Sequence, residues 1–213
     1  SQRPGINRFI SGQKAFARND IAVVMTIKRS MFLEANDTCI KVHFKPTDTI
    51  NDVYEKFNTV VQKNSVVDGT NSFDKLNKLL LFIPGLLLRW TVKFLNLLDY
   101  FGLLPKKLLE LSPFHGSMII TSMGSLGIKP IYHHIYDFGN LPVFVSYGTK
   151  RSVATMDKDG KMSKRKYIDI KVVTDERICD GYYYASAFKM MRRFVENPEV
   201  LETPPEQVFE DID

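Results

Sequence analysis

"VVTDERICDGYYYASAFKMMRRFVENPEVLE", residues 172–202, contains the end of a strand, a turn and a complete helix. The strand-like run closes at Thr174, and Asp180 followed by Gly181 supplies the residue types of a tight turn. A helix is predicted over residues 182–196, and the Asn197-Pro198 pair ends it. The face that this helix is expected to bury consists of Tyr184, Phe188, Met191 and Phe194. This stretch therefore predicts a strand, a turn and a helix in immediate succession.

Two strand-like segments precede this stretch, at residues 117–121 and 142–148, and a third, at 167–174, runs into its beginning. The last two flank a polar run that contains Asp159-Gly160. An Asp-Gly pair between alternating apolar residues is a strong signal for a β-hairpin. The two segments are therefore expected to pair antiparallel.

The N-terminal part shows the same mixture of elements. Strands are predicted at residues 21–28 and 40–44, and the second alternates apolar and polar residues. A helix is predicted over residues 49–61, with Thr49 and Asp52 in the positions of a capping box. Read coarsely, strands and helices alternate along the chain.

The composition is that of one globular domain over residues 1–213, with an acidic tail at 197–213 that contains no Lys or Arg and is expected to be exposed. The net charge of +5 is moderate, and the basic cluster at 161–166 is interpreted as a solvated hairpin, so we expect no nucleic-acid partner. Two distant cysteines and four histidines form no convincing metal site. Without a secretion signal at the start, a cytoplasmic location is expected.

The hydrophobic region at residues 79–104 needs a separate explanation. Its longest uncharged run ends at Leu88 and is broken by Pro84-Gly85, whereas a membrane-spanning helix needs about 20 apolar residues. After the break, an amphipathic helix is predicted, with Arg89 and Lys93 on its polar face. Its apolar face consists of Leu86, Trp90, Phe94, Leu97, Leu98 and Phe101. We expect this face to pack on the core or on a neighbouring subunit, and not on a membrane. Peripheral membrane contact and an acyl-chain site are the less favoured alternatives.

Several of these segments together resemble a known family. GSMIITSMGSLGIKPIYHH at 116–134, LPVFVSYGTK at 141–150, the hairpin and the stretch at 172–202 are similar, in order, to the catalytic domain of the 2-oxo acid dehydrogenase dihydrolipoyl acyltransferases. RPGINRFISGQKAFARNDIAVVMTIK, at 3–28, is similar to the segment that leads into a central strand of that domain. Family members have about a further quarter of the domain before this point, so the chain is expected to lack that N-terminal portion.

The resemblance implies the fold of chloramphenicol acetyltransferase. This is a two-layer α+β sandwich, with a mixed, largely antiparallel sheet and helices on one face. It also implies a homotrimer, or a higher assembly of trimers, with active sites between subunits. Other subunits of an acyl-transfer complex are further candidate partners.

The activity that the resemblance implies is transfer of an acyl group between a coenzyme A or lipoamide thioester and an acceptor, with coenzyme A as substrate and no metal. In the family, the histidine of Asp-His-Arg-x-x-Asp-Gly takes a proton from the acceptor, and a hydroxyl donates to the oxyanion. The histidine position is Glu176 in this chain. The hydroxyl role falls to Thr121, with Ser122 as second candidate, and Asp180 is expected to be structural.

Glu176 has two interpretations. An ordinary glutamate, with a pKa of about 4.3, is a weak base toward a thiol with a pKa near 8.5, unless burial between subunits raises it. The other interpretation is a carboxylate paired with Arg177 or another cation in a site that has lost catalysis. His133 and His134, or His115, are alternative bases. The competing function is therefore a catalytically inactive family member that serves as a trimeric assembly or ligand-binding protein.

Overall fold

A central sheet of five strands organises the molecule in the computed structural model, which describes residues 2–28, 37–64, 82–156 and 159–211. The strand order is β4-β3-β5-β6-β7. The strands are β3 (Ile21–Lys28), β4 (Asp37–Phe44), β5 (Met118–Ser122), β6 (Val143–Met156) and β7 (Met162–Thr174). The outer pairs β3-β4 and β6-β7 are antiparallel, and β5 is parallel to both β3 and β6. The predicted mixed sheet is confirmed, with its pairings divided evenly between the two directions.

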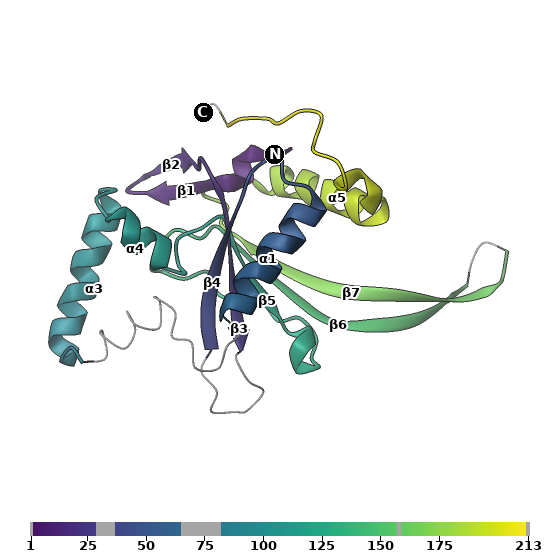
Figure 1. Cartoon of the computed structure of the whole chain (residues 1–213), viewed down its shortest axis with the longest axis horizontal. Coiled ribbons are helices and arrows are strands. Elements are labelled where there is room, and N and C mark those ends of the chain that lie inside the picture. The colour runs from purple at the N-terminus through teal and green to yellow at the C-terminus, as the bar shows by residue number, and fades with distance from the viewer. Residues whose placement is uncertain (1, 29–36, 65–81, 157–158, 212–213) are drawn as a thin grey trace.

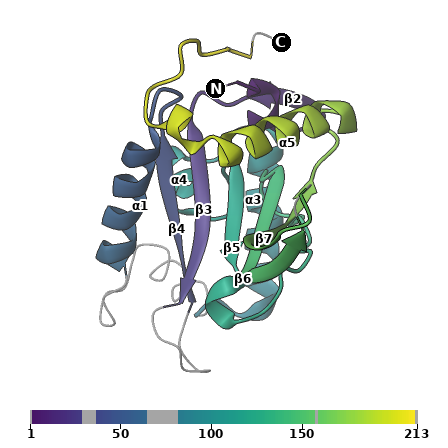
Figure 2. The same cartoon turned by 90° about the vertical axis from the view of Figure 1, so that its right-hand side faces the viewer.

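Two helices, α1 (Ile50–Asn64) and α5 (Gly181–Glu196), lie on one face of this sheet (Figures 1 and 2). The apolar side of α1 packs on a buried cluster of Val23, Ile40, Val42 and Phe44 through Val53, Phe57 and Val60. The α5 helix packs through Tyr184 on Val143 and Ile178. The expected α+β arrangement of a mixed sheet with helices is thereby confirmed.

The other face of the sheet is covered differently. Its buried cluster consists of Val24, Ile119, Leu141 and Phe144. Two further helices, α3 (Gly85–Tyr100) and α4 (Lys106–Leu111), stand on this side, behind the sheet in Figure 2. Helices are therefore present on both sides of the sheet, not on one only.

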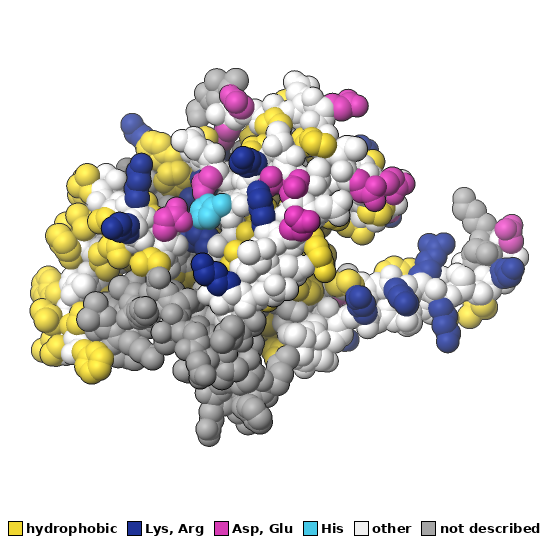
Figure 3. Space-filling model, in the orientation of Figure 1, with side chains coloured by type: hydrophobic (Ala, Val, Ile, Leu, Met, Phe, Trp, Pro, Cys, Tyr) yellow, Lys and Arg dark blue, Asp and Glu magenta, His cyan; other side chains and the backbone are white. Residues whose placement is uncertain are grey.

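The β6-β7 hairpin projects well beyond the rest of the sheet (Figure 1). Met156 pairs with Met162 near its tip, and Gly160 adopts a φ of 77°, which a residue without Cβ accommodates without strain. The antiparallel hairpin predicted from Asp159-Gly160 is confirmed. Its Lys and Arg side chains extend into solvent (Figure 3), as predicted for the basic cluster.

The two chain ends meet above the sheet. A small antiparallel pair that the sequence did not indicate, β1 (Arg8–Ser11) and β2 (Lys14–Ala17), precedes β3. The Arg8 guanidinium forms two hydrogen bonds of 2.6 Å with the Asp211 carboxylate. Most described residues of the acidic tail are exposed, as expected, and this ion pair holds its end against the first strand.

The α3 helix begins after the Pro84-Gly85 break, as predicted. Its apolar face does not pack on the core, however: the side chains of Leu86, Trp90 and Phe94 are 78%, 68% and 59% exposed. The predicted packing of this face on the core of its own chain is therefore wrong. The described part of the chain contains no helix with the length and hydropathy that a bilayer-spanning segment needs.

Candidate functional site

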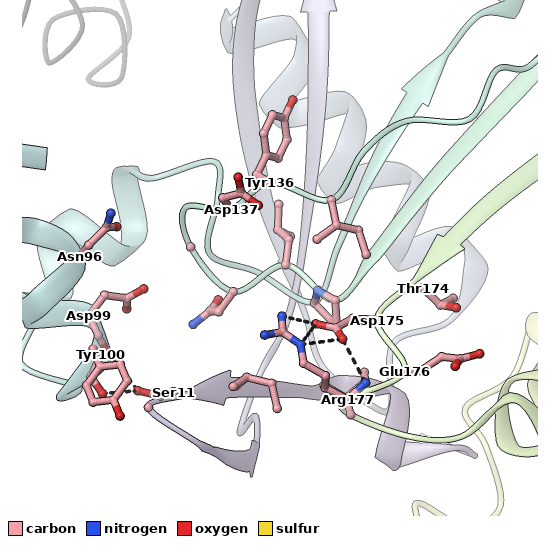
Figure 4. A pocket seen from close by; sticks show the side chains of 18 residues that line it. Ser11, Asn96, Asp99, Tyr100, Tyr136, Asp137, Thr174, Asp175, Glu176 and Arg177 are labelled. Atoms are coloured by element: carbon pink, nitrogen blue, oxygen red, sulfur yellow. Dashed lines mark hydrogen bonds and ion pairs between the residues drawn. The ribbon is translucent and has the colours of Figure 1, made fainter. Parts of the chain in front are cut away.

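The segment between β7 and α5 borders a cavity of about 630 Å³ (Figure 4). The other walls come from the end of β1, the last turns of α3 and the loop before β6. Polar side chains dominate the lining, among them Ser11, Asp99, Asn140, Asp175 and Glu176. The Glu176 region thus lies beside an open space large enough for part of a small-molecule ligand.

Asp175 and Arg177 form an ion pair at the rim of this cavity. Arg177 Nη2 and Nε lie 2.6 and 3.0 Å from Asp175 Oδ2, and the Arg177 backbone amide donates to Oδ1 at 3.0 Å. Burial acts to raise the pKa of Asp175, but the hydrogen bonds from Arg177 oppose it and prevail, so the pKa lies below its usual range. The guanidinium is therefore occupied by Asp175.

Glu176 is exposed and points away from this pair (Figure 4). Among the described residues, no cation forms an ion pair with its carboxylate. The interpretation in which Arg177 neutralises Glu176 does not describe this arrangement, because Arg177 pairs with the preceding residue instead.

Asp180 shapes the turn that carries Glu176. Its Oδ1 accepts a hydrogen bond of 2.8 Å from the Tyr183 amide, so the side chain caps the N-terminus of α5. The Tyr184 hydroxyl donates to the Asp175 carbonyl at 3.1 Å, and Ile178 is 3% exposed. The short segment from Asp175 to Asp180 is thus held at both ends and in the middle.

Thr121 and Ser122, the candidate hydroxyls, lie at the end of β5 and away from Glu176. Thr121 pairs with Ser146, which pairs in turn with Lys171. β7 ends at Thr174, which lies about 10 Å along the strand from Lys171, and Glu176 comes after that end. β7 is also two strands, or about 10 Å, away from β5 across the sheet. A single chain therefore does not bring the two side chains together.

His133 lies on the same face of the sheet as Thr121. Its ring stacks on Phe144 with centroids 4.3 Å apart, and Phe144 pairs with Ile119, two residues before Thr121 on β5. Burial lowers the pKa of His133, and its Nε2 has no hydrogen-bond partner among the described residues. The neighbouring His134 is exposed.

His115 lies in a different, buried environment at 4% exposed. Its Nδ1 is 2.7 Å from Ser112 Oγ, and its Nε2 lies 3.3 Å from Asp99 Oδ2 without the geometry of a hydrogen bond. It lines a second cavity of about 270 Å³ together with Arg18 and Lys41. Burial lowers the pKa of Arg18 to about 10 and that of Lys41 to about 8.

Asp99 and Asn140 border both cavities and were not singled out from the sequence. Asp99 comes from the inner side of α3, and Asn140 from the loop before β6, where its side chain receives a hydrogen bond from Arg18. No local motif marks either residue, since only the folding of distant segments joins them. Among the described residues, no group of three His, Cys, Asp or Glu side chains could hold a metal ion.

Comparisons with known proteins yield similarity to solved structures alone: no family model matches the sequence, and no curated protein does. The chain is similar to a probable dihydrolipoamide acetyltransferase from Listeria monocytogenes, with 14% identity and a TM-score of 0.49, over 92% of this chain and 64% of that one. It is also similar to the dihydrolipoamide acetyltransferase of Azotobacter vinelandii and to the cubic core of the pyruvate dehydrogenase multienzyme complex. Each has 12% identity and a TM-score of 0.48, over 94% of this chain and 64% of the other. The chain therefore spans less than two thirds of each of these structures.

Proposed function

We propose that this protein is an acyltransferase, which moves an acyl group between a coenzyme A or lipoamide thioester and an acceptor, and that Glu176 is its base. The observation that carries the proposal is the position of Glu176, which is among the residues that line the cavity and whose carboxylate forms an ion pair with no cation of the described residues. A carboxylate retained only for structure would be expected to hold a cation or a backbone amide, as Asp175 and Asp180 do.

The proposed reaction uses Glu176 first as base and then as acid. The acceptor thiol or hydroxyl gives its proton to the carboxylate as its sulfur or oxygen forms a bond to the thioester carbonyl. The Thr121 hydroxyl donates a hydrogen bond to the oxyanion of the tetrahedral intermediate. The carbon–sulfur bond to coenzyme A then breaks, and the proton on Glu176 passes to the leaving thiolate.

This scheme needs two copies of the chain. Because Thr121 and Glu176 are separated along the sheet, the hydroxyl of one subunit would have to meet the carboxylate of the next. We propose a homotrimer, in which burial at the interface also removes water from Glu176. Desolvation disfavours the charged form of a carboxylate and would raise its basicity.

The same separation also favours a second candidate, a trimeric assembly or ligand-binding protein without catalysis. In that case Glu176 and Thr121 do not meet in the assembly either, and the cavity beside Asp175 binds a ligand that is not turned over. The two functions differ in whether binding of a thioester is followed by release of a free thiol.

Titration calorimetry with coenzyme A and acetyl-coenzyme A tests both candidate functions. The measurements use the intact protein, Thr121→Ala, Glu176→Gln and the control Glu202→Gln, which alters an exposed tail carboxylate. Thiol release from acetyl-coenzyme A, with a dithiol acceptor, then measures turnover. We expect binding by all four proteins and a loss of turnover of at least a hundredfold in Glu176→Gln, since general bases contribute about 10²–10⁴-fold. Binding without turnover by the intact protein would favour the ligand-binding function. Absence of binding would refute acyl transfer and would favour a role in assembly.

A further inference from the structure

The outer side of α3 is an apolar surface that no described residue covers. We define it as Leu86, Leu87, Trp90, Phe94, Leu97 and Phe101, whose side chains are between 53% and 78% exposed. The helix stands at the edge of the molecule, away from α1 and α5 (Figure 1), and apolar atoms gather over it in the space-filling view (Figure 3). Monomeric proteins rarely expose contiguous apolar surface of this extent without a binding function.

The apolar surface continues past both ends of the helix. Phe82, before α3, is 86% exposed, and Leu103, after it, is 65% exposed. Only the opposite side of the helix, with Leu88, Leu95 and Leu98, turns toward the rest of the chain and is half-buried. The helix therefore presents its larger and more aromatic side chains outward.

Basic side chains border the outer surface. Arg89 and Lys93 on α3 are exposed, as are Lys106 and Lys107 at the start of α4. None of the four forms an ion pair within the described part of the chain. The Lys93 ammonium instead lies 5.2 Å from the centre of the Trp90 ring.

The acidic residues of the same region turn away from this surface. Asp99 faces His115, with 3.3 Å between the carboxylate oxygen and Nε2, and Glu110 lies 3.0 Å from His43 Nε2. The outer surface of α3 thus combines aromatic and aliphatic groups with positive charge that no acidic side chain of the described residues pairs.

We propose that the outer surface of α3 binds the surface of a membrane that contains anionic lipids. An amphipathic helix with Leu, Phe and Trp on one side and Lys and Arg along its border can lie in the plane of the headgroups, with its apolar side in the acyl region. Tryptophan favours this interfacial depth, and each nearby basic residue adds attraction to a negatively charged leaflet. The proposal is independent of acyl transfer.

A second copy of the chain fits this surface less well than a membrane does. Helix pairing through the same surface brings Arg89 and Lys93 of both copies to one interface, where no acidic side chain of the described surface compensates them. Like charges placed together destabilise such a contact, whereas a layer of anionic headgroups neutralises them.

The tryptophan content makes the test specific, because Trp90 is the only tryptophan in the chain. The full chain is titrated with vesicles of phosphatidylcholine alone, and with vesicles that contain phosphatidylglycerol as well. Binding is followed by the emission maximum of Trp90 and by flotation. We expect a shift to shorter wavelength and at least tenfold stronger partition into the anionic vesicles.

Substitutions separate the apolar and the electrostatic contributions. Phe94→Glu should abolish partition, whereas Val195→Glu, which introduces the same charge at a 72% exposed apolar position of α5, should leave it unchanged. Lys93→Gln should weaken partition about fivefold and Lys189→Gln, on α5, should not. Circular dichroism checks that each variant is folded.

Two results would overturn the proposal. One is an emission maximum of Trp90 that anionic vesicles leave unchanged at all lipid concentrations. The other is sedimentation of the protein as an oligomer that Phe94→Glu dissociates, without vesicle binding by the intact chain. The second result would assign the same surface to contacts between copies.

Discussion

Replacing Phe144 by alanine should remove much of the stability of this protein. The side chain is 5% exposed and packs with Val24, Ile119 and Leu141, while the His133 ring stacks on it at 4.3 Å. Burying a phenylalanine side chain contributes about 1.5–3 kcal/mol relative to leaving it exposed. With the cavity that alanine leaves, we expect a loss of about 3–5 kcal/mol in the free energy of unfolding. Total stabilities of domains are about 5–15 kcal/mol, so the variant should be folded but marginal.

The same substitution should change the titration of His133. Burial lowers the pKa of this histidine in the intact protein, so its neutral form is favoured by folding. The contribution of neutral His133 to the free energy of unfolding is therefore complete above the unfolded-state pKa of about 6.5. It is lost as the pH falls toward the lower pKa of the folded state. A cavity beside the ring admits water, and the pKa of His133 should rise toward its ordinary value in Phe144→Ala.

Urea unfolding followed by circular dichroism at pH 7.5 and 5.5 measures the stability, and NMR titration of the imidazole measures the pKa. Phe144→Leu retains an apolar side chain and should cost less than about 1.5 kcal/mol. Val195→Ala, at an exposed position, should stay within about 0.5 kcal/mol of the intact protein. The packing argument would be refuted by a loss below about 1 kcal/mol in Phe144→Ala with an unchanged denaturant slope.

Three further predictions concern the candidate site. Asp180→Ala removes the cap of α5 and should lower the unfolding free energy by about 1 kcal/mol, while Asp180→Asn should cost much less; equal losses in urea titrations would contradict the capping role. Gly139→Ala should be among the most destabilising single substitutions, because φ is 87° and a Cβ would lie 2.2 Å from the Phe114 carbonyl oxygen. A melting temperature within about 2 °C of that of the intact protein would contradict this prediction, since such a shift corresponds to only about 0.5–1 kcal/mol. Asp175→Asn should reduce the fall in the free energy of unfolding that the intact protein shows at low pH. Since Arg177 holds the pKa of Asp175 below its unfolded value, its contribution is present above pH of about 4 and is lost at lower pH, and an unchanged fall in the variant would exclude this ion pair as its source.

The periodicity of the sequence was sufficient to predict most elements of the sheet. A strand-like apolar run located β3 without error, apolar alternation located β4 within a few residues, and Asp159-Gly160 predicted the turn between β6 and β7. These signals are local, because a strand buried on one face must alternate and a two-residue turn needs residues that tolerate positive φ. The short β1-β2 pair was missed, since its burial depends on segments far along the chain.

The sequence by itself predicted most of the strands and helices, and it placed Glu176 two residues after a strand. Only the tertiary structure decided what surrounds that carboxylate: Arg177 pairs with Asp175, Asp99 and Asn140 complete the cavities, and Thr121 lies elsewhere on the sheet. It also decided that the apolar side of α3 faces outward. The physical reason is that amphipathic periodicity reports that a face is apolar, and not what that face contacts; the contact depends on the docking of distant segments, which no local pattern encodes.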